Sequence, residues 1–402
     1  MAKSRATSRF AKLLSEVEPV EGYTSTLLSD LILINQIPAP TFQEAQRATF
    51  VKQRLEEFGL EKVFMDEAGN VCAEISAGKA NRGAVLICAN LDTDLGPEDN
   101  IFVSIDEEMA RGAGVARNGL GLAGLLALGE MLANGDVSID RDVLLAATVA
   151  QEGEGGSRGA REVAARYGDR TALAICMQGL GLRRIGHRSD AKLGFEVRCT
   201  ALRDDRWHAS AESRAIGCLS EVLLELYSVP LPKRAETALN IFEISGGAQS
   251  GIKADAVLRG ELTASDDAIV DRLDKVVKSK VSKVAAATQQ SVCLHPTGRF
   301  RQGGLPKSHS VVRRAVEVHE LLGLEAVLGV HGADGSLLSE EGIPTLTTGL
   351  SRGGFLEDGT EYVEIPPIAL GLKKVLLLAM SARGRDVKRK RNEPDSGTGR
   401  KE

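Results

Sequence analysis

Short apolar segments that alternate with amphipathic stretches are the feature that most restricts how this chain can fold. Four segments have the length of strands and end in loops rich in Gly, Asp, Asn or Glu: 71–75, 84–89, 143–149 and 172–177. Helical patterns lie around them, at 24–59 (in two parts), 120–133 and 157–168. Apolar strands that alternate with helices are typical of a mostly parallel sheet covered on both faces. The sequence therefore predicts a layered α/β domain.

A second pattern interrupts the first and predicts an inserted domain. Within residues 191–297 the strand and helix signals follow the order β-α-β-β-α-β, as in the ferredoxin-like split unit. The α/β pattern then resumes. We therefore expect a discontinuous α/β domain of residues 1–190 and 298–384 and an inserted α+β domain at 191–297. Residues 385–402 contain Lys-Arg-Lys-Arg and no apolar periodicity, which predicts a disordered basic tail.

Composition restricts the partners and the compartment. The 402 residues include 55 Asp and Glu against 50 Lys and Arg, which argues against a surface that binds nucleic acid. No window holds the roughly 18 apolar residues of a membrane span, and the first residues lack the apolar region of a secretory signal. Six cysteines without closely spaced pairs are typical of free thiols in a reducing compartment. We therefore predict a cytoplasmic protein.

Five polar loops follow the predicted strands and mark the candidate site. In open α/β sheets, ligands bind beyond the carboxyl ends of the strands. The loops are at residues 89–94, 112–121, 150–161, 177–184 and 349–363. We expect their side chains to lie close together.

Ordered motifs in these loops resemble those of the zinc exopeptidase and amidohydrolase family, which includes glutamate carboxypeptidase, peptidase T, aminoacylase and succinyl-diaminopimelate desuccinylase. The motifs are Leu-Asp-Thr at 91–93, Gly-x-Gly-x-x-x-Asn-Gly-Leu-Gly at 112–121, the run from 148 to 161 and Ala-Asp-Gly-Ser at 333–336. The resemblance covers residues 25–383. It implies a zinc-exopeptidase-like α/β domain, an inserted lid through which two copies dimerise, and two zinc ions.

Four of the five metal-ligand positions implied by the resemblance carry other side chains. Asn90 stands where the family has a histidine, and Gln178 where it has a carboxylate. Arg117, beside Asn118, replaces the carboxylate that bridges the two zinc ions. Residues 349–363 contain no histidine for the fifth position. Asparagine and glutamine are poor zinc ligands, so we expect no metal and no other cofactor.

The catalytic positions are also changed. Of the ligands that the resemblance implies, only Glu152 remains. Asp92 also remains, at the position of the aspartate that orients the ligand at position 90 in the family. The position of the general base is Gln151, whose amide cannot accept a proton near neutral pH. A guanidinium is always charged. We therefore expect Arg117 to replace the charge of the metals and to neutralise Asp92 and Glu152, the latter as a bidentate pair.

Two histidines and two lid positions complete the candidates. The resemblance places His208 near the dimer interface, within reach of the partner's site, and His331 in a loop that faces the site. The substrate-binding Asn and Arg of the family's lid fall on Ser250 and Thr263.

Three functions remain open. The leading hypothesis is a non-hydrolytic homodimer that binds a small anionic peptide-like or N-acyl amino acid ligand beside Arg117, or that serves as an interaction subunit. The second is an enzyme that acts without zinc on amide or peptide bonds, or in another reaction, through Asp92 and Glu152 with His208 or His331. The third, and least favoured, is nucleic-acid binding through the basic tail.

Overall fold

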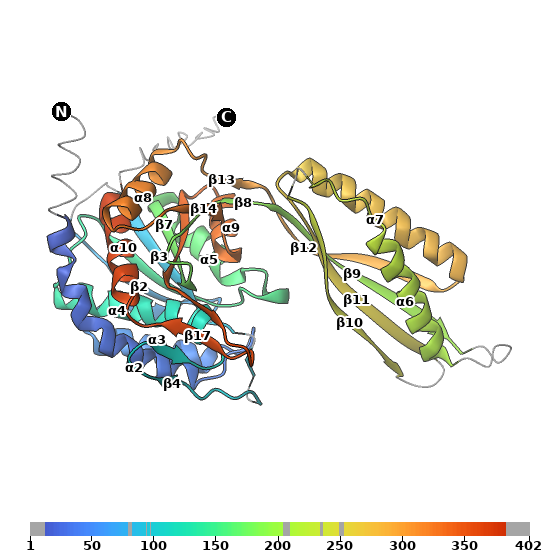
Figure 1. Ribbon diagram of the computed structural model, residues 1–402, viewed down its shortest axis with the longest axis horizontal. Coiled ribbons are helices and arrows are strands. Elements are labelled where there is room, and N and C mark those ends of the chain that lie inside the picture. The colour runs from blue at the N-terminus through green and yellow to red at the C-terminus, as the bar shows by residue number, and fades with distance from the viewer. Residues whose placement is uncertain are drawn as a thin grey trace, which may run out of the picture.

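The structure is a computed structural model that describes residues 13–78, 83–93, 95–96, 98–203, 210–233, 236–248 and 253–382. His208, Ser250 and the predicted tail at 385–402 lie outside these residues. Figure 1 shows a body built on a central sheet and a second part, made of a sheet and two long helices, that extends from it. The predicted fold class, α/β with a largely parallel central sheet and a separate α+β unit, is confirmed. Each described helix is too short or too polar to span a lipid bilayer.

The central sheet has nine strands, of which the inner four run parallel. Their order is β1-β2-β6-β3-β7-β15-β8-β13, and β14 pairs with β8. The strands are β1 (Val63–Met65), β2 (Val71–Ile75), β3 (Ala84–Asn90), β6 (Val143–Thr148), β7 (Thr171–Leu180), β8 (Arg184–Ser189), β13 (Gly303–Gly304), β14 (Val327–Val330) and β15 (Thr345–Ser351). Because β6, β3, β7 and β15 are parallel, their carboxyl ends meet at one edge of the sheet.

Helices cover both faces of this sheet, as the alternating pattern predicted (Figure 1). One face packs against α2 (Thr24–Asn35), α3 (Ala45–Glu57), α4 (Leu120–Asn134), α8 (Ser310–Leu321) and α10 (Ile368–Ser381), and a short turn, η1 (Glu18–Tyr23), precedes α2. The other face packs against α5 (Arg158–Tyr167) and α9 (Ala333–Glu340). The sequence pattern did not predict α9, since its eight residues contain Gly335 and two serines.

A small four-stranded sheet brings the last polar loop to the site. It consists of β4 (Ser104–Ile105), β5 (Met109–Arg111), β16 (Gly353–Phe355) and β17 (Glu361–Glu364), in the order β16-β17-β5-β4. Pairing of β17 with β5 places residue 361 next to the turn η2 (Val115–Gly119), which leads into α4.

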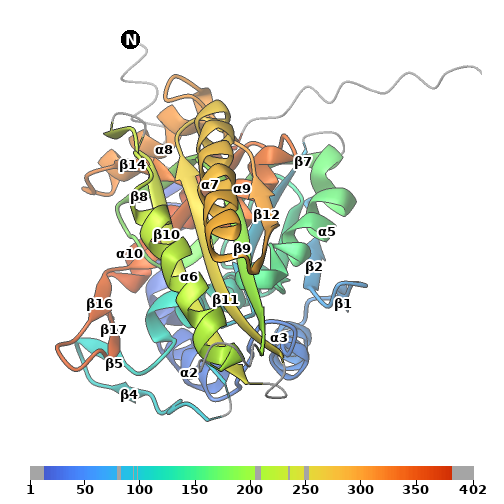
Figure 2. The same ribbon diagram turned by 90° about the vertical axis from the view of Figure 1, so that its right-hand side faces the viewer.

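The second part is an antiparallel sheet with its own core, which we call the lid. Its elements are β9 (Ala191–Leu202), α6 (Ala211–Tyr227), β10 (Ala238–Ala248), β11 (Lys253–Ala264), α7 (Asp267–Thr288) and β12 (Ser291–Phe300). The strand order β10-β11-β9-β12 is that of the predicted ferredoxin-like unit. Figure 2 shows α6 and α7 on the side of the lid sheet that faces away from the body. The residue boundaries of the domains remain predictions.

Candidate ligand-binding site

The predicted amide side chains meet at the carboxyl edge of the central sheet. Asn90 ends β3, Gln178 lies near the end of β7 and Gln151 follows β6. All three line one cavity of about 10 Å³, which is room for a single group the size of a water molecule. The wall also includes Asp334, Cys88 and Cys176. The structure therefore brings Asn90, Gln151 and Gln178 together at one cavity.

Asp334, which the sequence analysis did not select, fixes the orientation of Asn90. Its Oδ2 accepts hydrogen bonds from Asn90 Nδ2 (2.9 Å) and from Thr148 Oγ1 (2.6 Å). Asn90 Nδ2 also lies 3.3 Å from Thr148 Oγ1. A carboxylate only accepts, so the nitrogen of the Asn90 amide must face Asp334. The Asn90 carbonyl oxygen is then turned away from this pair.

The carboxyl group of Asp334 is buried and incompletely hydrogen-bonded. The residue is 3% exposed, and its Oδ1 has no hydrogen-bond partner among the described residues. The side-chain hydroxyls of Thr148 and Ser157 both lower the pKa of Asp334. Burial and the nearby charge of Asp92 nevertheless raise the pKa of Asp334 from 3.8 to about 6.

The charge of Asp92 acts on Arg47, a buried arginine that the sequence analysis did not select. Asp92 is fully buried, and its Oδ2 accepts hydrogen bonds from Thr41 Oγ1 (3.1 Å) and from the backbone N–H of Glu152 (2.9 Å). Burial lowers the pKa of Arg47 to about 10, whereas the charge of Asp92 raises it. One signal could have revealed Arg47: it occupies a position in the apolar stripe of α3, with Ala48, Val51 and Leu55.

Arg117 forms an ion pair with Glu361. The distance from Arg117 Nε to Glu361 Oε1 is 3.5 Å, and the arginine side chain is 55% exposed. Glu361 Oε2 accepts a hydrogen bond from the backbone N–H of Ala116 (3.0 Å). The sequence did not suggest Glu361 as a partner, and the bidentate pair of Arg117 with Glu152 stays a prediction. The pairing of β17 with β5 brings Glu361 to η2, and no local pattern signals this long-range contact.

The other predicted residues have structural roles at the edge of the site or lie away from it. The Asn118 side chain donates to the backbone oxygen of Asp92, and Gln151 Nε2 donates to Oε1 of the exposed Glu152 (2.8 Å). Thr263 lies in the lid sheet, paired with Lys192 close to the point where β9 leaves the body.

His331 lies behind the cavity wall and is held neutral. Its Nδ1 is 3.0 Å from the hydroxyl of Thr347, which itself lines the cavity. The ring is buried, and burial together with the charges of His187 and Arg184 lowers its pKa to about 3.

The side chains at this edge do not suit a pair of zinc ions. Zinc prefers imidazole, thiolate or carboxylate ligands, about four for each ion. The ligand positions that the resemblance implies hold Asn90, Arg117 and Gln178 instead, and the cavity has room for one water-sized group. A two-metal site needs ions about 3.5–4 Å apart. Within the described ranges, no three His, Cys, Asp or Glu residues are placed to hold a metal.

Comparisons with known proteins identify the fold. No protein-family model matches the sequence, and no curated protein matches it. Solved structures do match. The di-peptidase Dug1p from Saccharomyces cerevisiae has a TM-score of 0.72 at 13% identity, over 92% of this chain and 98% of that one. The aminopeptidase PepT from Bacillus cereus has a TM-score of 0.65 at 17% identity, over 89% and 98%.

A third match is the YXEP protein of Bacillus subtilis, described as a dinuclear metal-binding peptidase of the M20 family. Its TM-score is 0.61 at 15% identity, over 90% of this chain and 98% of that one. The structural neighbours are thus peptidases and amidohydrolases. At these identities they establish the fold, and the chemistry has to be argued from the residues of this chain.

Proposed function

We propose that this chain is a non-hydrolytic ligand-binding protein built on a peptidase fold. The observation that carries the proposal is the set of three amides, Asn90, Gln151 and Gln178, around a cavity the size of one water. Hydrolysis of an amide bond needs an activated water and a base to deprotonate it. Gln151 cannot act as that base, and Glu152 lies exposed in a hydrogen bond to it.

The proposed ligand is peptide-like, a class that also includes N-acyl amino acids. The neighbours named above are peptidases with a similar fold, and ligands of open α/β sheets bind beyond the carboxyl ends of the strands, so this edge of the sheet is the natural place for such a ligand. The exposed guanidinium of Arg117 lies at this edge and can accept the anionic end of the ligand. Glu361 already pairs with Arg117 at 3.5 Å, so an incoming carboxylate would share or replace that contact.

Metal content and hydrolysis test this proposal together. After incubation with zinc and gel filtration, we expect far less than one zinc ion per chain by mass spectrometry of the metal. We also expect no zinc-dependent cleavage of a panel of tripeptides and N-acyl amino acids. Stoichiometric zinc with metal-dependent cleavage would reject the proposal. Metal-free cleavage that Glu152→Ala abolishes, and that the control Glu325→Ala leaves intact, would favour the alternative of an enzyme without zinc.

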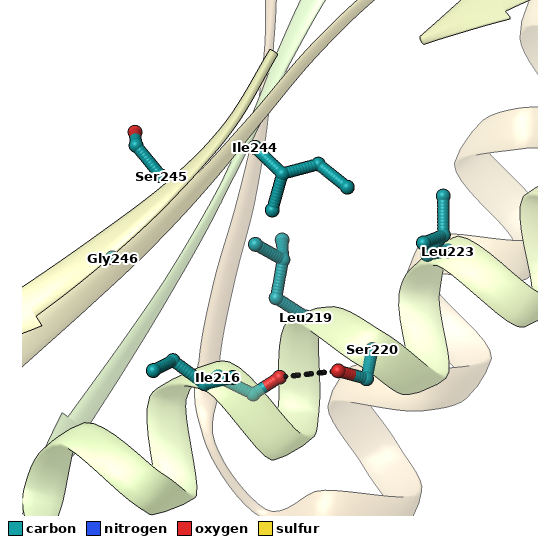
Figure 3. A pocket seen from close by; sticks show the side chains of 7 residues that line it. All are labelled: Ile216, Leu219, Ser220, Leu223, Ile244, Ser245 and Gly246. Atoms are coloured by element: carbon teal, nitrogen blue, oxygen red, sulfur yellow. Dashed lines mark hydrogen bonds between the residues drawn. The ribbon is translucent and has the colours of Figure 1, made fainter.

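We also propose that the lid joins two copies of the chain. Strand β10 is an edge of the lid sheet, and its eleven residues contain no Lys, Arg or Pro, the residues that usually protect an edge. A groove of about 160 Å³ lies between β10 and α6. Figure 3 shows the side chains that line it, among them Ile216, Leu219, Leu223 and Ile244. Ile216 is 47% exposed and Ile244 is 56% exposed. Antiparallel pairing of β10 with a second β10 would cover these side chains.

Sedimentation equilibrium tests the dimer. We expect twice the mass of one chain for the wild type and the mass of a single chain for Ile244→Lys, because a lysine charge in an apolar contact is not compensated. Met65→Lys is the control, since Met65 is an exposed apolar residue on the edge strand β1 of the body. A monomeric wild type, or a dimeric Ile244→Lys variant, would contradict the proposal.

A further inference from the structure

The cavity at the end of β3 and β7 is lined by the buried carboxyl group of Asp334. Oδ1 of Asp334 has no hydrogen-bond partner, although the residue is 3% exposed and lines the cavity. An unsatisfied buried charged group costs several kcal/mol in principle. Such an atom is therefore expected to meet a donor that enters the cavity.

The charges around the cavity are mostly negative. Asp334, Asp92 and Glu44 are buried, and the exposed Glu152 is hydrogen-bonded to Gln151, a residue of the cavity wall. The charge of Asp92 acts on Asp334, and the charges of Glu44 and Glu152 act on Asp92. Arg47 is the buried guanidinium next to this group, and its charge also acts on Asp92. The balance favours a positively charged group in the cavity.

The size of the cavity and the remaining polar atoms restrict that group further. A volume of about 10 Å³ admits a group the size of water and excludes a carboxylate or a phosphate. The Asn90 side-chain nitrogen donates to Asp334 and Thr148, so the side-chain oxygen of Asn90 remains as an acceptor. The Gln178 carboxamide lies in the same wall, where the absence of a side chain at Gly332 leaves room for it. A β-carbon at Gly332 would lie 2.6 Å from Gln178 Nε2.

We infer that this cavity receives a primary ammonium group, the cationic end of the peptide-like ligand, on Asp334 Oδ1 and the amides of Asn90 and Gln178. An ammonium group has three N–H donors and about the size of water, which matches one carboxylate oxygen and two carboxamides. A hard metal ion suits the wall less well, because sulfur atoms of Cys88 and Cys176 form part of it, and the contact with Cys176 together with burial raises the pKa of the Cys88 thiol. The inference rests on the proposed function, and it names the group on the ligand that the site recognises.

Two probes isolate the ammonium group. Alanylalanine amide carries the amino group and lacks a carboxylate, and its N-acetyl derivative lacks both charges. Isothermal titration calorimetry on the full chain at pH 7 is expected to give a dissociation constant for the free amine at least about tenfold lower than for the acetylated compound. Ammonium chloride is expected to compete with the free amine, whereas an equal concentration of potassium chloride is not.

Matched variants connect the preference to Asp334. Asp334→Asn keeps the shape of the side chain and is expected to reduce the preference to less than about twofold. Asp30→Asn is the control, because Asp30 is a buried aspartate in α2 that also has an unpartnered carboxylate oxygen and does not line the cavity. That variant is expected to keep the full preference. A far-ultraviolet circular dichroism spectrum shows whether each variant is folded.

The outcomes separate the inference from the function on which it rests. Equal affinity for both compounds, no binding of either, a preference that survives in Asp334→Asn, or competition by potassium as strong as by ammonium would each overturn the ammonium site. The proposed function fails on a different result, namely zinc-dependent hydrolysis. If Asp334→Asn does not fold, competition by ammonium against potassium in the wild type still decides the question.

Discussion

Replacing Arg47 with methionine is expected to lower the free energy of unfolding by about 3–5 kcal/mol, the range for breaking a buried charge pair from one side. Arg47 is 2% exposed. Its Nε donates to the oxygen of Ile37 (2.9 Å) and its Nη1 donates to the oxygen of Leu91 (3.0 Å). The variant leaves both carbonyl groups without these donors and removes the buried positive charge on which Asp92 acts. Urea denaturation at pH 7 measures the loss.

A double-mutant cycle separates the charge from the hydrogen bonds. Asp92→Asn removes the negative charge that acts on Arg47. We therefore expect this substitution to lower the free energy of unfolding less in the Arg47→Met variant than in the wild type, with a difference of about 1–2 kcal/mol. Lys52→Met, on the exposed face of the same helix, removes a surface pair with Glu56 and is expected to cost less than about 1 kcal/mol. A loss below 1 kcal/mol for Arg47→Met, or additive effects in the cycle, would show that Arg47 does not compensate Asp92.

The long elements of the fold could be predicted from local pattern, and the short ones could not. Strand β3 (84–90) is buried at every position, so an apolar run marks it completely. The strands of the small sheet are two to four residues long, which is too short to show an alternation of apolar and polar residues in the sequence. They form because β17 pairs with β5, a contact between segments about 250 residues apart. That contact also decides the partner of Arg117.

The candidate site divides in the same way. Asn90 and Gln178 could be placed together because parallel strands end at the same edge of a sheet. Asp334 belongs to the Ala-Asp-Gly-Ser motif at 333–336. Its role depends on which turn of α9 faces β3, and no local sequence signal indicates the orientation of that helix. Arg47 had a weak local signal, a charge within an apolar stripe. The sequence therefore identified which groups had been replaced in the site, whereas the structure was needed to find the groups that now balance its charge.

Acid is expected to destabilise this protein through two buried histidines. Burial lowers the pKa of His331 from 6.5 to about 3 and that of His319 to about 4, and nearby positive charges add to the effect, from His187 and Arg184 on His331 and from Lys374 on His319. In the unfolded chain both rings take up a proton near pH 6.5, whereas in the folded chain they stay neutral. The two histidines therefore do not reduce the free energy of unfolding above pH 6.5, and they reduce it progressively as the pH falls below that value.

The size of the effect follows from the shifts. Between pH 6.5 and pH 4.5 each histidine removes roughly 2–3 kcal/mol, at about 1.4 kcal/mol per pH unit. Asp334 acts in the opposite direction, because its raised pKa makes the folded chain bind a proton more readily than the unfolded chain between about pH 6 and pH 3.8. The two histidines together outweigh this one carboxyl group, so the net result is a loss of stability in acid.

His331→Asn tests the assignment to a single ring. Asparagine preserves a polar atom near the position of Nδ1, next to the Thr347 hydroxyl, and has no proton to gain in this range. The free energy of unfolding is measured by urea denaturation at pH 7 and at pH 4.5. The loss between these two pH values is expected to be roughly 2–3 kcal/mol smaller in this variant than in the wild type. The exposed His295 on β12 provides the control, and His295→Asn should leave the difference unchanged. If His331→Asn retains the full loss in acid, the ring does not stay neutral in the folded chain, and the buried position behind the cavity must be hydrated.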